Sequence, residues 1–133
     1  MKRKTVSAML ASALLSVAAL AAAGTIQTVK VNQVPALQSR GVLLLDVREV
    51  DEYAELHAPG STLIPLGQLQ QRLSEIKDYK DLQVAVICRS GNRSAQAIKV
   101  LERAGFSAAV NVEGGMNAWQ KAGLPVLSGK APR

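Results

Sequence analysis

Residues 84–94 read Val-Ala-Val-Ile-Cys-Arg-Ser-Gly-Asn-Arg-Ser, and they combine a strand, a short loop and the start of a helix. The apolar run that ends at Ile87 is typical of a central strand in a parallel sheet. Apolar residues at 97, 98 and 101 predict a helix from about Ser94 to Arg103, which ends before Gly105. Ligands of such sheets bind where a strand ends and a turn leads into a helix. Cys88 occupies that position.

The loop that begins at Cys88 has the composition of an anion-binding site. It is short and contains Gly91, so several backbone N–H groups can converge in front of the sulfur. Arg89 and Arg93 add positive charge, and the following helix presents its N-terminus. Together these features favour a thiolate over a thiol. Cys88 is the only cysteine, so it has no internal disulfide partner, and we expect it to be a nucleophile.

The flanking sequence alternates between strand and helix patterns. Further strands are predicted near residues 26–29, 42–47, 63–64 and 108–112, and helices near 32–38, 49–56, 66–76 and 116–122. This alternation predicts an α/β fold, a mostly parallel sheet with helices on both faces.

The N-terminal segment has the order of a secretory signal. Lys2, Arg3 and Lys4 precede an uncharged apolar run, which ends in small residues at 21–23. We therefore expect residues 1–23 to be a cleavable signal peptide and residues 24–133 to form one domain, which is periplasmic or otherwise exported. Because residues 6–23 approach the shortest membrane-spanning length of about 18 apolar residues, an uncleaved anchor with the domain outside the cytoplasm is the alternative.

The remaining composition excludes several classes of function. Three of the basic residues lie in the predicted signal, so the net charge of +6 falls to about +3 without it. Aromatic residues make up only 3% of the chain, so no basic and aromatic surface for nucleic acid is expected. His57 is the only histidine and cannot build a multi-histidine metal site. No metal or organic cofactor is predicted.

Four sequence blocks, taken together, resemble the rhodanese family. They occur in the family's order: Asp46-Val47-Arg48-Glu49 with Glu52-Tyr53, then His57-Ala58-Pro59-Gly60, then the loop from Cys88 to Ser94, then Gly114-Gly115-Met116 with Ala118-Trp119. The resemblance implies a rhodanese-like three-layer fold with a five-stranded, mainly parallel sheet. It also implies a single-domain thiosulfate sulfurtransferase, in which Cys88 takes sulfur from thiosulfate or a similar donor as a persulfide. Cyanide or a thiol, including the thiol of a protein, would then accept it.

The resemblance assigns roles to the residues around Cys88. The loop residues Arg89, Ser90, Gly91, Asn92 and Arg93 would bind the anionic substrate, with Arg93 on the donor and Arg89 either there or facing solvent.

Three further residues would support the loop. Ser94 is either a hydroxyl donor to the site or a helix cap. Asp46 and Arg48 would hold the loop and the neighbouring helix through ion pairs, with Arg48 paired to Glu52.

Two other functions remain open from the sequence. The protein could be a persulfide carrier or binding module that acts with a partner protein. It could also be an enzyme related to phosphatases or arsenate reductases. The cell-cycle phosphatases of the related group have a Cys-x5-Arg loop, whereas the loop from Cys88 to Arg93 is Cys-x4-Arg. A shorter loop should crowd a tetrahedral oxyanion, which favours sulfur chemistry.

Overall fold

A computed structural model describes residues 25–132 of the chain. The predicted signal peptide, residues 1–23, lies outside the described residues, so its cleavage stays a prediction. Among residues 25–132, no helix combines the length and the apolar character that crossing a membrane requires.

The centre of the domain is a parallel sheet of five strands. These are β1 (Thr28–Val29), β2 (Leu43–Asp46), β3 (Thr62–Leu63), β4 (Gln83–Ile87) and β5 (Ala108–Val112). Their order in the sheet is β1, β5, β4, β2, β3, and every neighbouring pair is parallel. The predicted α/β fold with a five-stranded parallel sheet is confirmed. Because β4 is the middle strand, the loop that follows it lies at the centre of the row formed by the carboxyl ends of the parallel strands.

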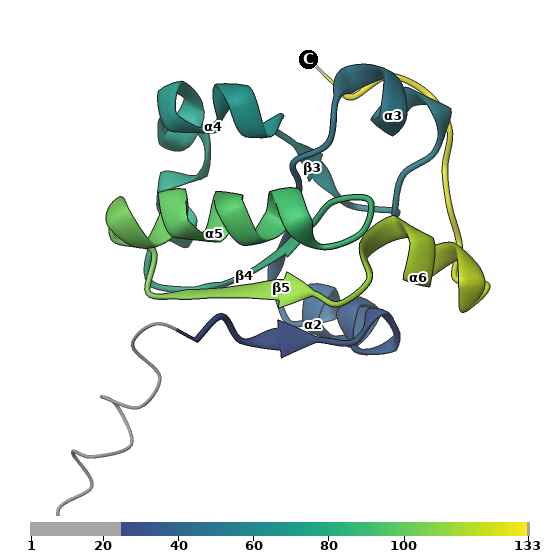
Figure 1. The fold of residues 1–133 in the computed structure, drawn as a ribbon, viewed down its shortest axis with the longest axis horizontal. Coiled ribbons are helices and arrows are strands. Elements are labelled where there is room, and N and C mark those ends of the chain that lie inside the picture. The colour runs from purple at the N-terminus through teal and green to yellow at the C-terminus, as the bar shows by residue number, and fades with distance from the viewer. Residues whose placement is uncertain (1–24, 133) are drawn as a thin grey trace, which may run out of the picture.

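Helices cover both faces of this sheet (Figure 1). The helical segments are η1 (Val31–Gln33), α2 (Val34–Ser39), α3 (Val50–Glu55), α4 (Leu66–Arg72), η2 (Leu73–Tyr79), α5 (Asn92–Arg103) and α6 (Gly115–Lys121). Alternate strand residues supply two separate cores, as the two-residue period of a strand requires. Val84, Val86 and Cys88 pack with α4 and α5, whereas Ala85 and Ile87 pack with α2 and α6.

Some helix boundaries differ from the predicted ones. The single helix expected over residues 66–76 is instead α4 followed by the 3-10 segment η2, with a non-helical backbone at Ile76. Ile76 nevertheless points into the core, so the apolar spacing predicted burial correctly although it did not predict the break. The helix after the loop begins at Asn92, two residues earlier than expected. Its first turn is therefore part of the loop that contains Cys88.

Candidate active site

Cys88 directly follows β4 and lies enclosed in its own loop. Only 1% of the residue is exposed, and the backbone N–H of Gly91 donates a hydrogen bond to its Sγ at 3.1 Å. Gly91 has a φ of +114°, a conformation that glycine adopts without strain. That turn points the N–H group back at the sulfur and ends at the first residue of α5. The predicted convergence of loop N–H groups on the sulfur is present at Gly91.

Hydrogen bonds lower the pKa of the Cys88 thiol below its ordinary value. Burial acts in the opposite direction and is the largest single influence, but it is outweighed by hydrogen bonds from the Ser94 hydroxyl and from the backbone N–H groups of Ser94, Gly91 and Ser90. These donors stabilise the thiolate, which is the nucleophilic form. The thiolate is thus favoured mainly by the loop backbone and one hydroxyl, rather than by the two arginines named from the sequence.

Ser94 links the sulfur to Asn111 on β5, a residue that the sequence patterns did not single out. Ser94 Oγ lies 3.3 Å from Cys88 Sγ and donates to Asn111 Oδ1 at 2.6 Å. The Asn111 amide also donates to the carbonyl of Gly91 at 3.1 Å. One side chain therefore orients both groups that contact the sulfur. Its signal in the sequence was a polar residue inside an otherwise apolar strand.

Ser94 is not a helix cap. It lies in the first turn of α5, whose N-cap is Gly91 and whose N-terminus has no side-chain cap. Its hydroxyl has one proton to donate. With a thiol at Cys88, the hydroxyl can keep donating to Asn111 Oδ1 while the S–H donates to Oγ. To stabilise a thiolate, the hydroxyl has to donate to the sulfur instead.

We expect Ser94→Ala to raise the pKa of Cys88, because the thiolate loses its only hydroxyl donor among the described residues. The rate of alkylation by iodoacetamide, measured against pH, should rise at a higher pH than in the wild type. Ser107→Ala, which changes an exposed serine outside this network, is the control. An unchanged or lower pKa of Cys88 in Ser94→Ala would mean that the Ser94 hydroxyl keeps donating to Asn111 and does not stabilise the thiolate.

The start of α6 holds the first two residues of the loop from the other side. The backbone N–H of Met116 donates to the carbonyl of Cys88 at 2.8 Å, and that of Asn117 donates to the carbonyl of Arg89 at 3.0 Å. Gly115 directly precedes these donors, and a Cβ atom there would lie 2.7 Å from the carbonyl carbon and oxygen of Arg89. The helix approaches the loop this closely because residue 115 has no side chain.

A buried ion pair at the end of β2 includes Arg48, which also contacts α3. The guanidinium of Arg48 donates from Nε and Nη2 to the carboxylate of Asp46, with distances of 2.8–3.1 Å, and Nη2 also donates to the carbonyl of Leu56 at 2.8 Å. The predicted ion pair between Arg48 and Glu52 is wrong: Arg48 reaches only the backbone carbonyl of Glu52, at 3.4 Å. The carboxylate of Asp46, two residues away and fully buried, takes the guanidinium instead.

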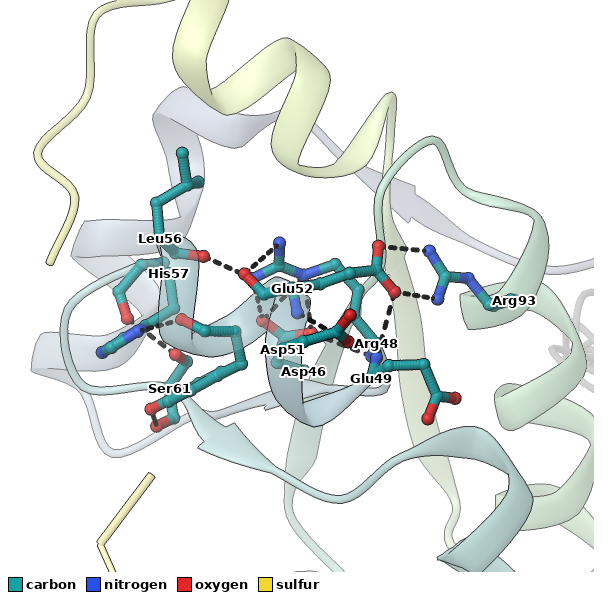
Figure 2. Close-up of polar contacts among 11 residues, drawn as sticks. Asp46, Arg48, Glu49, Asp51, Glu52, Leu56, His57, Ser61 and Arg93 are labelled. Atoms are coloured by element: carbon teal, nitrogen blue, oxygen red, sulfur yellow. Dashed lines mark hydrogen bonds and ion pairs between the residues drawn. The ribbon is translucent and has the colours of Figure 1, made fainter. Parts of the chain in front are cut away.

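The carboxylate of Glu52 pairs with Arg93 at the end of the loop. Arg93 Nη1 lies 2.6 Å from Glu52 Oε1, and Nη2 lies 2.9 Å from Oε2. Figure 2 shows Glu52 between Arg48 and Arg93, with both of its oxygens toward Arg93. The hydrogen bonds from Arg93 lower the pKa of Glu52 to about 2, against a smaller opposing effect of burial. Arg93 thus ties the loop to α3, while its predicted contact with the donor stays a prediction.

We expect Glu52→Gln to destabilise the protein at neutral pH and to do so less in acid. The pKa of Glu52 falls from 4.5 to about 2 on folding, so its stabilising effect is complete above pH 4.5 and is lost as the pH falls toward 2. Urea unfolding of both proteins at neutral pH and at stepwise lower pH measures this difference. Glu75→Gln removes an ion pair of the same type, with Arg72 on the surface, and should have a smaller effect. A difference that stays constant with pH would contradict the ion pair.

The other predicted loop residues face solvent. Arg89, Ser90 and Asn92 are exposed, and Ser90 acts on the sulfur through its backbone N–H. Arg89 lines a cavity of about 220 Å³ between α3 and α6, next to the loop. Within residues 25–132, no three His, Cys, Asp or Glu side chains are grouped as metal ligands would be.

Comparison with known proteins agrees with this geometry. The family model of the rhodanese-like domain matches residues 31–122, which include Cys88, its loop and the residues that contact the loop. The chain belongs to the rhodanese-like domain family. A sulfurtransferase of Allochromatium vinosum is 39% identical over 87 residues, which are 65% of this chain and 79% of that protein. A Bacillus subtilis protein named as a sulfur carrier is 40% identical over 76 residues, or 57% of this chain and 40% of that protein.

Solved structures of other rhodanese-type proteins have the same fold as this chain. A thiosulfate sulfurtransferase from Pseudomonas aeruginosa superimposes with a TM-score of 0.72 at 26% identity, covering 81% of this chain and 21% of that one. A rhodanese-related protein from Thermoplasma volcanium has a TM-score of 0.68 at 32% identity, covering 76% of this chain and 97% of that one. The rhodanese-like domain therefore occurs both in chains of about its own length and as part of longer chains.

Proposed function

We propose that this protein is a thiosulfate sulfurtransferase that carries sulfur on Cys88 as a persulfide. The observation that carries the proposal is the hydrogen-bonded sulfur at the end of β4, where Gly91 N–H donates to Sγ and the pKa of the thiol is lowered. Each form that the sulfur would take in the cycle, thiolate or persulfide, is an anion. A loop of aligned N–H donors stabilises both.

The first half-reaction is a displacement at the outer sulfur of thiosulfate. The Cys88 thiolate attacks that sulfur, the S–S bond of thiosulfate breaks, and sulfite leaves with the electron pair. The product is a Cys88 persulfide anion. Arg89, which has no ion-pair partner among residues 25–132, favours the approach of a dianionic donor through its field, whereas Glu52 offsets the charge of Arg93.

The second half-reaction returns the thiolate. Cyanide or a thiolate attacks the outer sulfur of the persulfide, the S–S bond to Cys88 Sγ breaks, and the electron pair stays on Sγ. The same donors that lower the pKa of the Cys88 thiol also make the Cys88 thiolate a better leaving group. One loop thus assists both steps, and ping-pong kinetics follow from the covalent intermediate.

Intact-mass spectrometry before and after thiosulfate, followed by cyanide, tests the proposal directly. We expect a gain of one sulfur atom, which cyanide removes as thiocyanate. No adduct with thiosulfate or other sulfane donors would overturn the proposal and favour a phosphatase-like or binding role.

A persulfide carrier is the second candidate, and the similarity to a protein named as a sulfur carrier favours it. A carrier would form the same adduct but would release sulfur slowly to small acceptors and quickly to a protein thiol. Turnover with cyanide, compared with transfer to thiol proteins, separates the two.

We also propose that the domain works outside the cytoplasm after cleavage of the chain following Ala23. N-terminal sequencing of the exported protein would test this.

A further inference from the structure

The cavity beside the loop is larger than cyanide, the smallest acceptor of the proposed reaction, requires. Its volume is about 220 Å³. A water molecule in the liquid takes about 30 Å³, so a cyanide ion would occupy only a small part of this space. The cavity is also smaller than the roughly 300–1,000 Å³ of drug-sized ligand sites. A molecule about as large as an amino acid fits these limits.

The cavity adjoins the loop, and one of its lining residues, Met116, is hydrogen-bonded to the backbone of Cys88. Arg89, the residue after Cys88, lines it from the loop, and Met116 and Asn117 line it from α6. The backbone N–H groups of Met116 and Asn117 donate to the carbonyls of Cys88 and Arg89, so this wall and the loop are fixed to each other. Another part of the lining comes from the end of α3, with Glu55 and the C-cap residue Leu56.

The charges on the cavity wall divide into paired and unpaired groups. Arg48 is neutralised by Asp46, and Glu52 is neutralised by Arg93. Within residues 25–132, neither Arg89 nor Glu55 takes part in an ion pair, and both are exposed. The cavity therefore offers one free cation and one free anion among its described lining residues.

Neutral groups complete the lining. Asn117 and Gln120 contribute side-chain amides, which can donate and accept hydrogen bonds, and Leu56 and Met116 contribute apolar surface. Opposite charges in one cavity complement a zwitterion better than a simple anion. A ligand with a carboxylate, an ammonium group and a short apolar arm matches the whole set.

We propose that this cavity is the acceptor subsite and binds a small zwitterionic thiol, an α-amino acid thiol such as cysteine, with its carboxylate at Arg89 and its ammonium group at Glu55. The proposal rests on the sulfurtransferase function and names the acceptor class for it. The acceptor thiolate attacks the outer sulfur of the Cys88 persulfide. A new S–S bond forms to the acceptor, the bond to Cys88 Sγ breaks, and its electron pair remains on Sγ, so the acceptor leaves as a persulfide.

The test uses the full domain loaded with one sulfur from thiosulfate and freed of excess donor. Intact-mass spectrometry follows the removal of that sulfur by four acceptors. These are cysteine, cysteamine, which lacks the carboxylate of cysteine, 3-mercaptopropionate, which lacks its ammonium group, and cyanide. Each acceptor is compared with itself in wild type and variant, so differences in thiol reactivity cancel.

Two charge variants should separate these acceptors. Glu55→Gln should raise the half-saturating concentration about fivefold for cysteine and cysteamine, the size of one solvent-exposed ion pair, and should not raise it for 3-mercaptopropionate or cyanide. Arg89→Gln should raise it for cysteine and 3-mercaptopropionate but not for cysteamine. Glu102→Gln, at the end of α5 and outside this cavity, should change none of them. Equal effects on all four acceptors, or no effect, would overturn the proposal.

A binding measurement keeps the cavity testable if sulfur transfer itself fails. Serine has the same charged groups as cysteine but cannot accept sulfur. We expect serine to shift the side-chain amide NMR signals of Asn117 and Gln120 in the unloaded protein, and to do so less in Glu55→Gln. Absence of a Cys88 persulfide would refute the proposed function, whereas absence of these shifts would refute the subsite.

Discussion

Cys88→Ser is expected to fold like the wild type and to take up no sulfur from thiosulfate. The change replaces sulfur by oxygen at a residue that is 1% exposed and keeps a group that can accept from Gly91 N–H and bond to Ser94. A serine hydroxyl stays protonated near neutral pH, and without the Cys88 sulfur no persulfide can form. Intact mass after incubation with thiosulfate should therefore show no adduct, and thiocyanate should not form on addition of cyanide.

Circular dichroism and thermal unfolding provide the control for this variant. They should match the wild type closely, because the substitution leaves no cavity and no buried polar group without a partner. Sulfur transfer that persists in folded Cys88→Ser would refute Cys88 as the nucleophile. Loss of both fold and transfer would instead show that the thiol has a structural role.

Gly115→Ala is expected to slow persulfide formation about 100-fold, since a displacement of about 1 Å in a reacting group can cost that much. Its Cβ would overlap the carbonyl of Cys88 and lie 2.7 Å from the carbonyl carbon and oxygen of Arg89. Those atoms are backbone, so the loop has to move. The N–H groups of Met116 and Asn117, which hold the loop, would move with it. Single-turnover mass measurements with thiosulfate give the rate.

Gly123→Ala separates the clash from backbone strain. Gly123 has a φ of +71° and Gly115 a φ of +54°, so alanine is strained at both positions, by about 1–2 kcal/mol. Nothing lies within 4 Å of a Cβ at Gly123. We expect Gly123→Ala to lower stability but to form the persulfide at the wild-type rate. Equal rates in the two variants would show that α6 does not hold the loop in place.

The elements of the fold and the position of Cys88 on its loop could be predicted from local sequence because their signals are local. The apolar run before Cys88 indicated a central strand, and β4 is the middle strand of the sheet. Gly91 indicated a loop whose N–H groups can converge in front of the sulfur, and it has a positive φ and donates to the sulfur. In both places the residue types and their spacing already contain the physical reason for the structure.

The partners of the charged and polar groups could not be predicted in this way. Arg48 had a plausible partner in Glu52 at helical spacing, yet it pairs with Asp46, because the end of β2 brings the two side chains together in a buried position. Glu52 instead forms an ion pair with Arg93, which is 41 residues away in sequence. Asn111, 17 residues from Ser94, is brought to it because β5 lies beside β4. Such contacts depend on the order of strands in the sheet, which local patterns do not contain.

The sequence by itself determined that this is an α/β domain with its one cysteine on a loop between a strand and a helix, because hydrophobic period and glycine position act over a few residues. Only the tertiary structure decided which groups set the state of that cysteine and which charges remain free around it. The physical reason is that hydrogen bonds and ion pairs act over a few ångströms, and chain folding alone determines which distant residues come that close.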